Sequence, residues 1–314
     1  MGLGQQTTLC ERAVLTGLGV HSNAAVRMVL NPAEADTGIV FRRIGLPGVS
    51  PRMIRADWSH VTMTELCTVI GDESRASVAT VEHLLAAFRG LGVDNVLIEI
   101  NGPEVPIMDG SSVEFVEAID SAGIETLDAP RRFVKILKPV RVQNGRSFCE
   151  LRPHDAGLRL DVEIDFTSSV IGRQKKTMDV SAGAFRRDLA RARTFGFLND
   201  VERLWKKGFA LGASFENTVA LREERVLNPE GLRFADEFVR HKMLDALGDL
   251  ALAGAPILGL FRSFCGGHRM NVAVLQALFA DRTAYALVEA GPLRRAALRP
   301  EFGTTQPAFA LEAN

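Results

Sequence analysis

The sequence lacks a charge excess of either sign. Lysine and arginine number 37 and aspartate and glutamate 38, which gives a formal net charge of −1 at pH 7. Proteins that bind nucleic acids usually carry a basic excess, so nucleic acid is not an expected partner. The sequence also lacks an apolar run of 18 residues and a signal-like N-terminus. We therefore expect neither an integral membrane segment nor secretion.

Cysteine is scarce as well. Cys10, Cys67, Cys149 and Cys265 are scattered along the chain without CxxC spacing. Such a distribution predicts reduced thiols rather than a disulfide framework, and reduced thiols are typical of cytoplasmic proteins.

The composition is that of a globular protein. The chain has 314 residues, 46% hydrophobic and 24% charged, and this length accommodates two domains. Strand-like alternation is found at 26–30, 39–42, 95–100, 133–142, 147–152 and 158–166. A charged stretch with a proline, 125–132, separates two such regions, so we predict domains at 1–127 and 128–314. Each half runs strands first and helices later, which indicates an α+β fold.

The segment 238–249 predicts a helix with two distinct faces. His241, Asp245 and Asp249 are four residues apart and therefore share one face. The opposite face is apolar and consists of Met243, Leu244, Leu247, Leu250 and Ala251. Taken alone, the polar face is more often solvated than functional. A histidine and an aspartate one turn apart can also bind one metal ion, but a catalytic zinc site usually has three protein ligands.

A second helix is predicted at 77–90, because Ser or Thr stands near its start and Gly90 at its end. Glu82 and His83 lie directly before its apolar residues. Adjacent helical residues point about 100° apart, so one could bind a metal while the other acts on a water molecule. The alternative is an exposed glutamate favoured by the helix dipole and a half-buried histidine.

Six motifs occur in a fixed order. They are Thr80-Val-Glu-His83-Leu, Pro103-Glu-Val-Pro-Ile-Met-Asp109-Gly-Ser, Arg193-Thr-Phe-Gly-Phe197, Val226-Leu-Asn, Leu232-Arg-Phe-Ala-Asp-Glu-Phe-Val-Arg-His241-Lys-Met-Leu-Asp245-Ala-Leu-Gly-Asp249 and Gly267-His268. Together they resemble the UDP-3-O-acyl-N-acetylglucosamine deacetylases of lipid A biosynthesis, the LpxC family. The resemblance covers nearly the whole chain.

The resemblance implies a zinc-dependent hydrolase. Its substrate would be UDP-3-O-(3-hydroxyacyl)-N-acetylglucosamine, and release of its N-acetyl group as acetate would be the committed step of lipid A biosynthesis. The motif match assigns one zinc ion per chain to His83, His241 and Asp245, although these ligand types also permit Fe²⁺ in the cell. The implied fold is a layered α/β/β/α-type sandwich of two similar domains, each a β-sheet with helices on one face.

The resemblance also implies catalytic roles. Glu82 matches the general base that takes a proton from the attacking water. His268 matches the imidazolium that acts on the developing charge and the leaving amine, and Asp249 would orient it. Thr194 matches a hydroxyl that stabilises the oxyanion.

The expected substrate-binding residues follow from the same match. Lys242 would lie near the pyrophosphate, and Asp165 and Phe166 near the uracil ring. A βαβ insert at about 194–217, read as strand, amphipathic helix and a second strand near 208–212, would form the acyl passage. The other residues assigned to substrate are His21, Phe195, Phe197, Val201, Ala210 and Ser214. By themselves, His21 reads as a surface residue on a turn and the apolar residues as ordinary core.

Two departures from the family pattern stand out. Thr167-Ser168-Ser169 replaces a common His-Pro after Phe166, and Gly266 stands where Ser is frequent. The first departure favours the alternative of a zinc amidohydrolase of the same fold with a different acylated substrate. A non-enzymatic binding protein is disfavoured, because Glu82 and the ligands are intact. We expect a cytoplasmic monomer that contacts its amphiphilic UDP-sugar substrate and transiently the inner-membrane surface.

Overall fold

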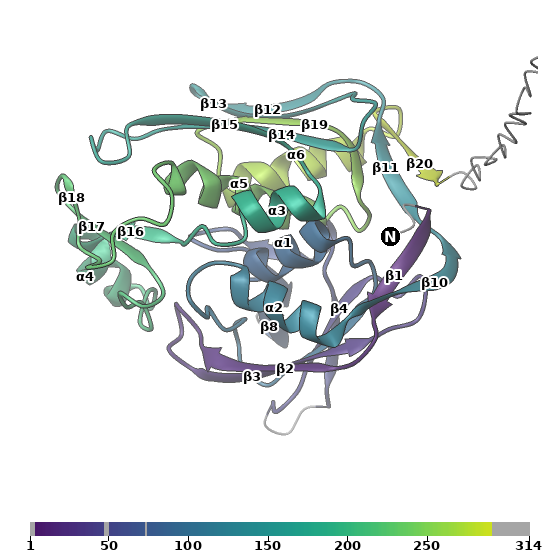
Figure 1. Cartoon of the computed structure of the whole chain (residues 1–314), viewed down its shortest axis with the longest axis horizontal. Coiled ribbons are helices and arrows are strands. Elements are labelled where there is room, and N and C mark those ends of the chain that lie inside the picture. Colours follow the sequence, from purple (N-terminus) through teal and green to yellow (C-terminus); the bar gives the residue numbers. More distant parts are fainter. Residues whose placement is uncertain (1–3, 47–49, 73, 291–314) are drawn as a thin grey trace, which may run out of the picture.

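The computed structural model describes residues 4–46, 50–72 and 74–290. Two large sheets face each other across two layers of helices (Figure 1). The five-stranded sheet has the order β2 (Ala13–Leu18), β3 (Ala25–Pro32), β9 (Val96–Ile100), β4 (Ile39–Arg43) and β5 (Arg52–Arg55). The expected strands at 26–30, 39–42 and 95–100 are thereby confirmed.

The seven-stranded sheet comes from the second half of the chain. Its main path is β12 (Val140–Asn144), β13 (Ser147–Arg152), β19 (Ile257–Phe264), β11 (Arg132–Ile136) and β20 (Tyr285–Glu289), while β14 (Leu158–Asp165) pairs with β19 and with β15 (Arg173–Asp179). The stretch expected as one strand at 133–142 is two strands, β11 and β12.

Six helices are found in the described ranges 4–46, 50–72 and 74–290. They are α1 (Glu82–Leu91), α2 (Val113–Ala122), α3 (Ala182–Asp188), α4 (Leu198–Lys206), α5 (Glu237–Ala251) and α6 (His268–Ala280), and a 3-10 turn covers Trp58–His60. The predicted helix at 238–249 is confirmed as part of α5. None of these helices has the length and apolarity that crossing a bilayer requires.

The α+β sandwich with helices on one face of each sheet is confirmed, but the expected layer order is inverted. The order is sheet, helices, helices, sheet, not α/β/β/α (Figure 1). All ten residues of α1 are buried, and α1 packs against α5. A helix that is buried on every side must lie between other layers, so the helices of the two halves meet in the centre.

The start of the first predicted helix is also corrected. Residues 76–78 form β8 (Ala76–Val78), which pairs with β7 (Val69–Asp72), and β7 pairs with β6 (Val61–Met63). Thr80 then has φ 55°, a conformation that a helix does not contain. The helix therefore begins at Glu82 and not near Ser77, which makes Glu82 and His83 its first two residues.

The insert has the predicted βαβ order with a displaced second strand. β16 (Phe195–Phe197) runs parallel to β17 (Val219–Arg222), with α4 between them, and β18 (Arg225–Val226) extends this sheet. The strand expected near 208–212 is absent from this described segment, because Gly208 and Ala210 have φ values of 79° and 56°. Positive φ is incompatible with a strand.

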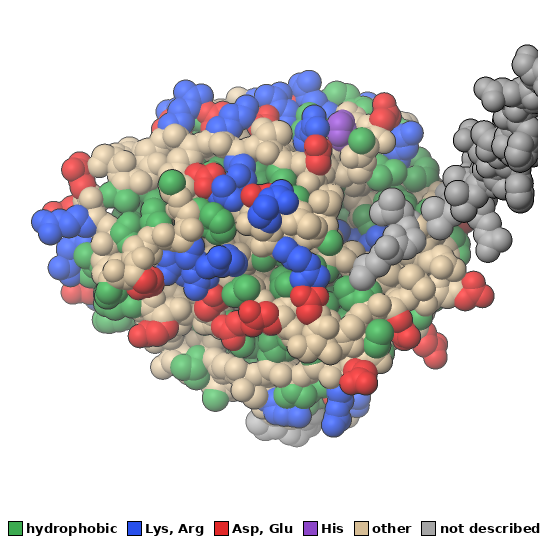
Figure 2. Space-filling view, viewed as in Figure 1, with side chains coloured by type: hydrophobic (Ala, Val, Ile, Leu, Met, Phe, Trp, Pro, Cys, Tyr) green, Lys and Arg blue, Asp and Glu red, His purple; other side chains and the backbone are tan. Residues whose placement is uncertain are grey.

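The stretch expected to separate the two domains is itself a strand. β10 (Ile124–Pro130) pairs antiparallel with β1 (Gln5–Leu9) at the side of the sandwich. The boundary between 127 and 128 thus falls within β10 and stays a prediction, and residues 291–314 of the second predicted domain lie outside the described residues. Lys and Arg side chains alternate with Asp and Glu over the face seen in Figure 2, in keeping with the balanced charge.

Candidate active site

The helices α1 and α5 come unusually close where the candidate residues lie. A β-carbon at Gly248 of α5 would collide with the backbone carbonyl of Glu82 at the start of α1. Glycine therefore allows the two helix backbones to touch. This contact brings His83, from the first half of the chain, next to the polar face of α5.

His83, His241 and Asp245 form one cluster. Their nearest donor atoms all lie within 4.8 Å of one another. His83 Nε2 is 3.5 Å and His241 Nε2 3.3 Å from Asp245 Oδ1. The three residues are at most 4% exposed, so the solvated-face alternative is wrong for this part of α5.

The cluster fits a metal ion. Asp245 Oδ1 is buried and has no hydrogen-bond partner among the residues that the structure describes. A buried acceptor without a partner is costly, and a cation between it and the two imidazoles would remove that cost. Two histidines and one carboxylate are also a donor set of catalytic metal sites.

The protonation states of the cluster suit metal binding. His241 Nδ1 is 3.0 Å from the Ala192 carbonyl, which can only accept, so the proton sits on Nδ1 and Nε2 keeps its lone pair. Burial lowers the pKa of His241 to about 3, which keeps the ring neutral. Burial would raise the pKa of Asp245, but His241 and Lys242 outweigh it and hold this pKa well below its ordinary value. Metal ligands must be deprotonated in this way.

Beside the cluster lie two carboxylates, Glu82 and Asp249, with the imidazole of His268 between them. His268 Nδ1 is 2.9 Å from Asp249 Oδ2, and His268 Nε2 is 3.9 Å from Glu82 Oε1. Burial raises the pKa of Glu82. Burial alone would lower the pKa of His268, but Asp249 and Glu82 raise it to about 9. At neutral pH the site therefore pairs a cationic imidazole with a carboxylate of increased basicity.

A cavity of about 650 Å³ opens from this group of residues toward the insert. Nearly all the predicted site residues line it, namely His21, Glu82, His83, Phe166, Thr194, Phe195, Phe197, Val201, Ala210, Ser214, His241, Lys242, Asp245 and His268. Two do not. Asp249 is 0% exposed and lies behind His268, and Asp165 pairs with Arg146 at 2.8 Å.

The insert closes one side of the cavity with apolar groups. Phe195 stands edge-on to Phe238 of α5, with ring centroids 5.0 Å apart, and Lys242 Nζ lies 5.7 Å from the Phe195 ring centre. His21 Nδ1 accepts a hydrogen bond from the Ala210 amide at 3.2 Å. His21 is thus part of the cavity wall and only partly exposed, unlike the surface residue that its turn suggests.

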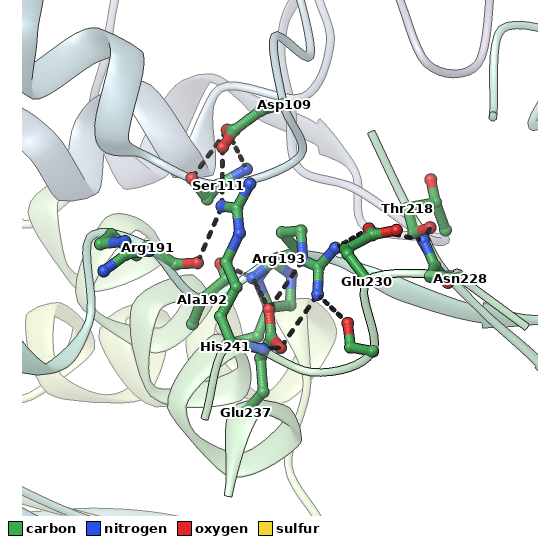
Figure 3. A network of polar contacts seen from close by, with 12 residues as sticks. Asp109, Ser111, Arg191, Ala192, Arg193, Thr218, Asn228, Glu230, Glu237 and His241 are labelled. Atoms are coloured by element: carbon green, nitrogen blue, oxygen red, sulfur yellow. Dashed lines mark hydrogen bonds and ion pairs between the residues drawn. The ribbon is translucent and has the colours of Figure 1, made fainter. Parts of the chain in front are cut away.

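A buried ion pair fixes the segment that carries Thr194 (Figure 3). Arg193, 2% exposed, donates to Glu237 through its amide at 3.0 Å and its Nε at 2.9 Å. It also donates to Glu230 at 2.6 Å. The neighbouring Ala192 carbonyl is the acceptor for His241 (Figure 3). The Arg193 amide thereby fixes the peptide group that it shares with Ala192, whose carbonyl contacts the candidate ligand His241. The Thr194 amide donates to the Gly110 carbonyl at 2.8 Å, which holds the next peptide group.

Sequence reasoning assigned no role to Arg193 or to Glu104. Glu104 is 1% exposed and accepts from the His21 amide at 3.0 Å and from the Thr80 hydroxyl at 2.8 Å. It connects the His21 turn to Thr80, which lies two residues before α1. Both residues are charged and lie within two of the six motifs. An ionisable residue in a motif that is otherwise apolar or catalytic is the sequence signal that could have identified them.

Comparison with known proteins gives consistent matches. The LpxC family model, described as UDP-3-O-acyl N-acetylglycosamine deacetylase, matches residues 6–280. Proteins of Brucella ovis and of Brucella melitensis biotype 2, both named UDP-3-O-acyl-N-acetylglucosamine deacetylase, are each 51% identical to this chain over 286 residues. These alignments cover 91% of this chain and 99% of each relative.

Proposed function

Because this chain belongs to the LpxC family of UDP-3-O-acyl-N-acetylglucosamine deacetylases, we propose that it removes the N-acetyl group of UDP-3-O-(3-hydroxyacyl)-N-acetylglucosamine in lipid A biosynthesis. Water cleaves the amide bond, and acetate and the free 2-amine are the products. The observation that carries this proposal is the buried cluster of His83, His241 and Asp245 beside Glu82 and His268, at one end of a largely apolar cavity.

The three clustered residues would hold zinc, with Fe²⁺ as the other cation that this donor set accepts. A zinc ion bound there would polarise the acetyl carbonyl and make a water molecule more acidic. Lys242 Nζ donates to Asp245 Oδ2 at 2.7 Å, whereas Oδ1 has no hydrogen-bond partner among the described residues and would be the oxygen that the metal uses. His241 is oriented by the Ala192 carbonyl, which is how ligating histidines are usually fixed.

The remaining residues would perform the proton transfers. Glu82 takes a proton from the attacking water, and its raised pKa makes it the stronger base. His268, cationic at neutral pH, stabilises the developing negative charge and gives its proton to the leaving nitrogen. Asp249 keeps that imidazole oriented, and the Thr194 hydroxyl donates to the oxyanion.

The cavity suits an amphiphilic substrate, because its lining is mostly apolar and ends in ionisable groups at the cluster. We assign the acyl chain to the passage beside the insert, where Val201, Ala210 and Ser214 line the wall with Phe195, Phe197 and His21. Lys242 would contact the pyrophosphate, and Phe166 with Asp165 the uracil. We also propose that the enzyme acts as a monomer in the cytoplasm, with transient contact to the inner membrane that receives its product.

The test is acetate release from UDP-3-O-(3-hydroxyacyl)-N-acetylglucosamine, before and after chelation and with zinc added back. We expect activity to disappear on chelation and to return with zinc. Asp245→Ala should lose both the metal and turnover, while His268→Ala should keep the metal and lose turnover. A wild-type protein with one equivalent of zinc that releases no acetate would contradict the proposed substrate. It would favour a different acylated substrate, in line with the Thr167 to Ser169 departure.

A further inference from the structure

Thr68 touches both carboxylates of the proposed acid–base machinery. It lies directly before β7 and is 0% exposed. Its backbone amide donates to Glu82 Oε2 at 3.1 Å, and its hydroxyl donates to Asp249 Oδ1 at 2.6 Å. Thr68 and Asp249 are 181 positions apart in the chain. One residue from the first half thus contacts a carboxylate on α1 and another on α5.

These contacts close a ring of four residues. From Thr68 the ring runs to Glu82, on to His268 at 3.9 Å and back through Asp249, which His268 approaches at 2.9 Å. Asn271 adds a donor to Asp249 Oδ2 at 2.9 Å. Both oxygens of Asp249 are therefore occupied, and the hydroxyl of Thr68 is the donor that occupies Oδ1.

The hydroxyl has a consequence for His268. A buried carboxylate keeps its charge and its orientation only while donors surround it. Without the Thr68 hydroxyl, Asp249 Oδ1 loses its donor, and the carboxylate can rotate about its side chain. Rotation would move the oxygen that orients His268 relative to Glu82.

We propose that Thr68 is a positioning residue, whose hydroxyl fixes Asp249 and through it the His268 imidazole opposite Glu82. This inference rests on the proposed function for its catalytic meaning. The side chain of Thr68 lies outside the residues that line the cavity, so it acts on the acid and not on the substrate.

Thr68→Val isolates this role. Valine has the shape of threonine and keeps the backbone amide that donates to Glu82, so only the contact with Asp249 is removed. Thr68→Ser keeps the hydroxyl. A control is Thr8→Val, because Thr8 is also buried, at 1% exposure. Its hydroxyl donates to the Asn95 carbonyl at 2.8 Å and accepts from the Ala33 amide at 2.8 Å, so this change removes at least as many buried hydrogen bonds far from the site.

The experiment measures kcat, KM, bound zinc and thermal midpoint for these variants as purified holoenzymes. We expect Thr68→Val to lower kcat about 10- to 100-fold, as for other residues that orient a catalytic group, with KM and zinc content unchanged. Thr68→Ser should restore kcat, and Thr8→Val should leave it unchanged. In an Asp249→Ala background, Thr68→Val should cause no further loss, because both changes break one interaction.

A second measurement is independent of turnover. In imidazole carbon–proton correlation spectra, Thr68→Val should shift the His268 signal, assigned by its loss in His268→Ala, and leave His60 and His154 unshifted. Each of four results would overturn the proposal. In Thr68→Val these are an unshifted His268 signal or a kcat equal to wild type. The others are a Thr68→Ser variant whose kcat is not restored, and losses of kcat that add to those of Asp249→Ala. Absence of turnover in the wild type would instead contradict the proposed function, and the spectra would still decide the role of Thr68.

Discussion

The wall of the cavity formed by α1, α5 and α6 is built differently from the wall formed by the insert. Along the helical wall, Glu82, His241 and Asp245 are at most 3% exposed. On the insert wall, none of the residues of α4 is buried, and Trp205 is 54% exposed. The helical wall is held by buried hydrogen bonds between both halves of the chain, whereas α4 has few such constraints.

This difference separates two tasks. Proton transfer requires atoms held to within a few tenths of an ångström, and several partners for each side chain provide that. Accommodation of an acyl chain requires apolar surface and tolerates some movement. We therefore expect substitutions on the helical wall to reduce turnover strongly and substitutions on the insert to change mainly the choice of acyl chain.

The largest effect is expected at Glu82. Glu82→Gln keeps the shape and the acceptor for the Thr68 amide but removes the base, so kcat should fall by about 10²- to 10⁴-fold. Zinc content should stay at one equivalent, because Glu82 is not among the proposed ligands. Turnover and metal analysis on the same sample check this. Activity close to wild type would show that Glu82 is not the base. It would also show that substitutions on the helical wall affect turnover no more than substitutions on the insert.

A smaller and pH-dependent effect is expected at Asp249. His268 has its pKa raised to about 9 by Asp249 and Glu82 against the effect of burial, and its charged form is the proposed acid. Activity should therefore be present below this pKa and be lost as pH rises through about 9. Asp249→Asn removes the first of these two carboxylates, so the alkaline limb of the kcat profile should move to lower pH.

The control for this shift is Asp281→Asn. Asp281 is a partly exposed carboxylate that pairs with Lys138 at 2.7 Å, remote from the cavity. Its variant should keep the alkaline limb of wild type. An Asp249→Asn profile that is reduced in height but unmoved along the pH axis would show that Asp249 does not set the protonation of His268.

The two walls also differ in how well the sequence predicts them. The helix at 238–249 is evident because its apolar stripe and its i, i+4 polar pairs are local patterns. The burial of its polar face depends on Gly248 against Glu82, a contact between the two halves that no local pattern indicates. The third clustered residue, His83, came from family resemblance and not from spacing.

Backbone conformations set by distant contacts account for the errors. The strand expected near 208–212 fails because Gly208 and Ala210 adopt positive φ, and the Ala210 amide donates to His21. The helix expected from 77 starts late because Thr80 has positive φ and its hydroxyl donates to Glu104. The patterns of residues around Ala210 and Thr80 predict a strand and a helix. The interruptions are evident only from the contacts with His21 and Glu104, which are distant in the sequence.

The smallest effect is expected on the insert wall, at Val201 of α4. Val201 lines the cavity, so Val201→Phe should narrow the passage and favour shorter acyl chains. The kcat/KM ratio between a long and a short 3-O-acyl substrate should change by about 10- to 200-fold, as for other apolar pockets, while kcat on the shorter substrate stays near wild type. Glu202→Phe is the control, because Glu202 is exposed on the same helix and does not line the cavity. An equal fall in kcat for every chain length would mean that this wall, too, positions the reacting groups.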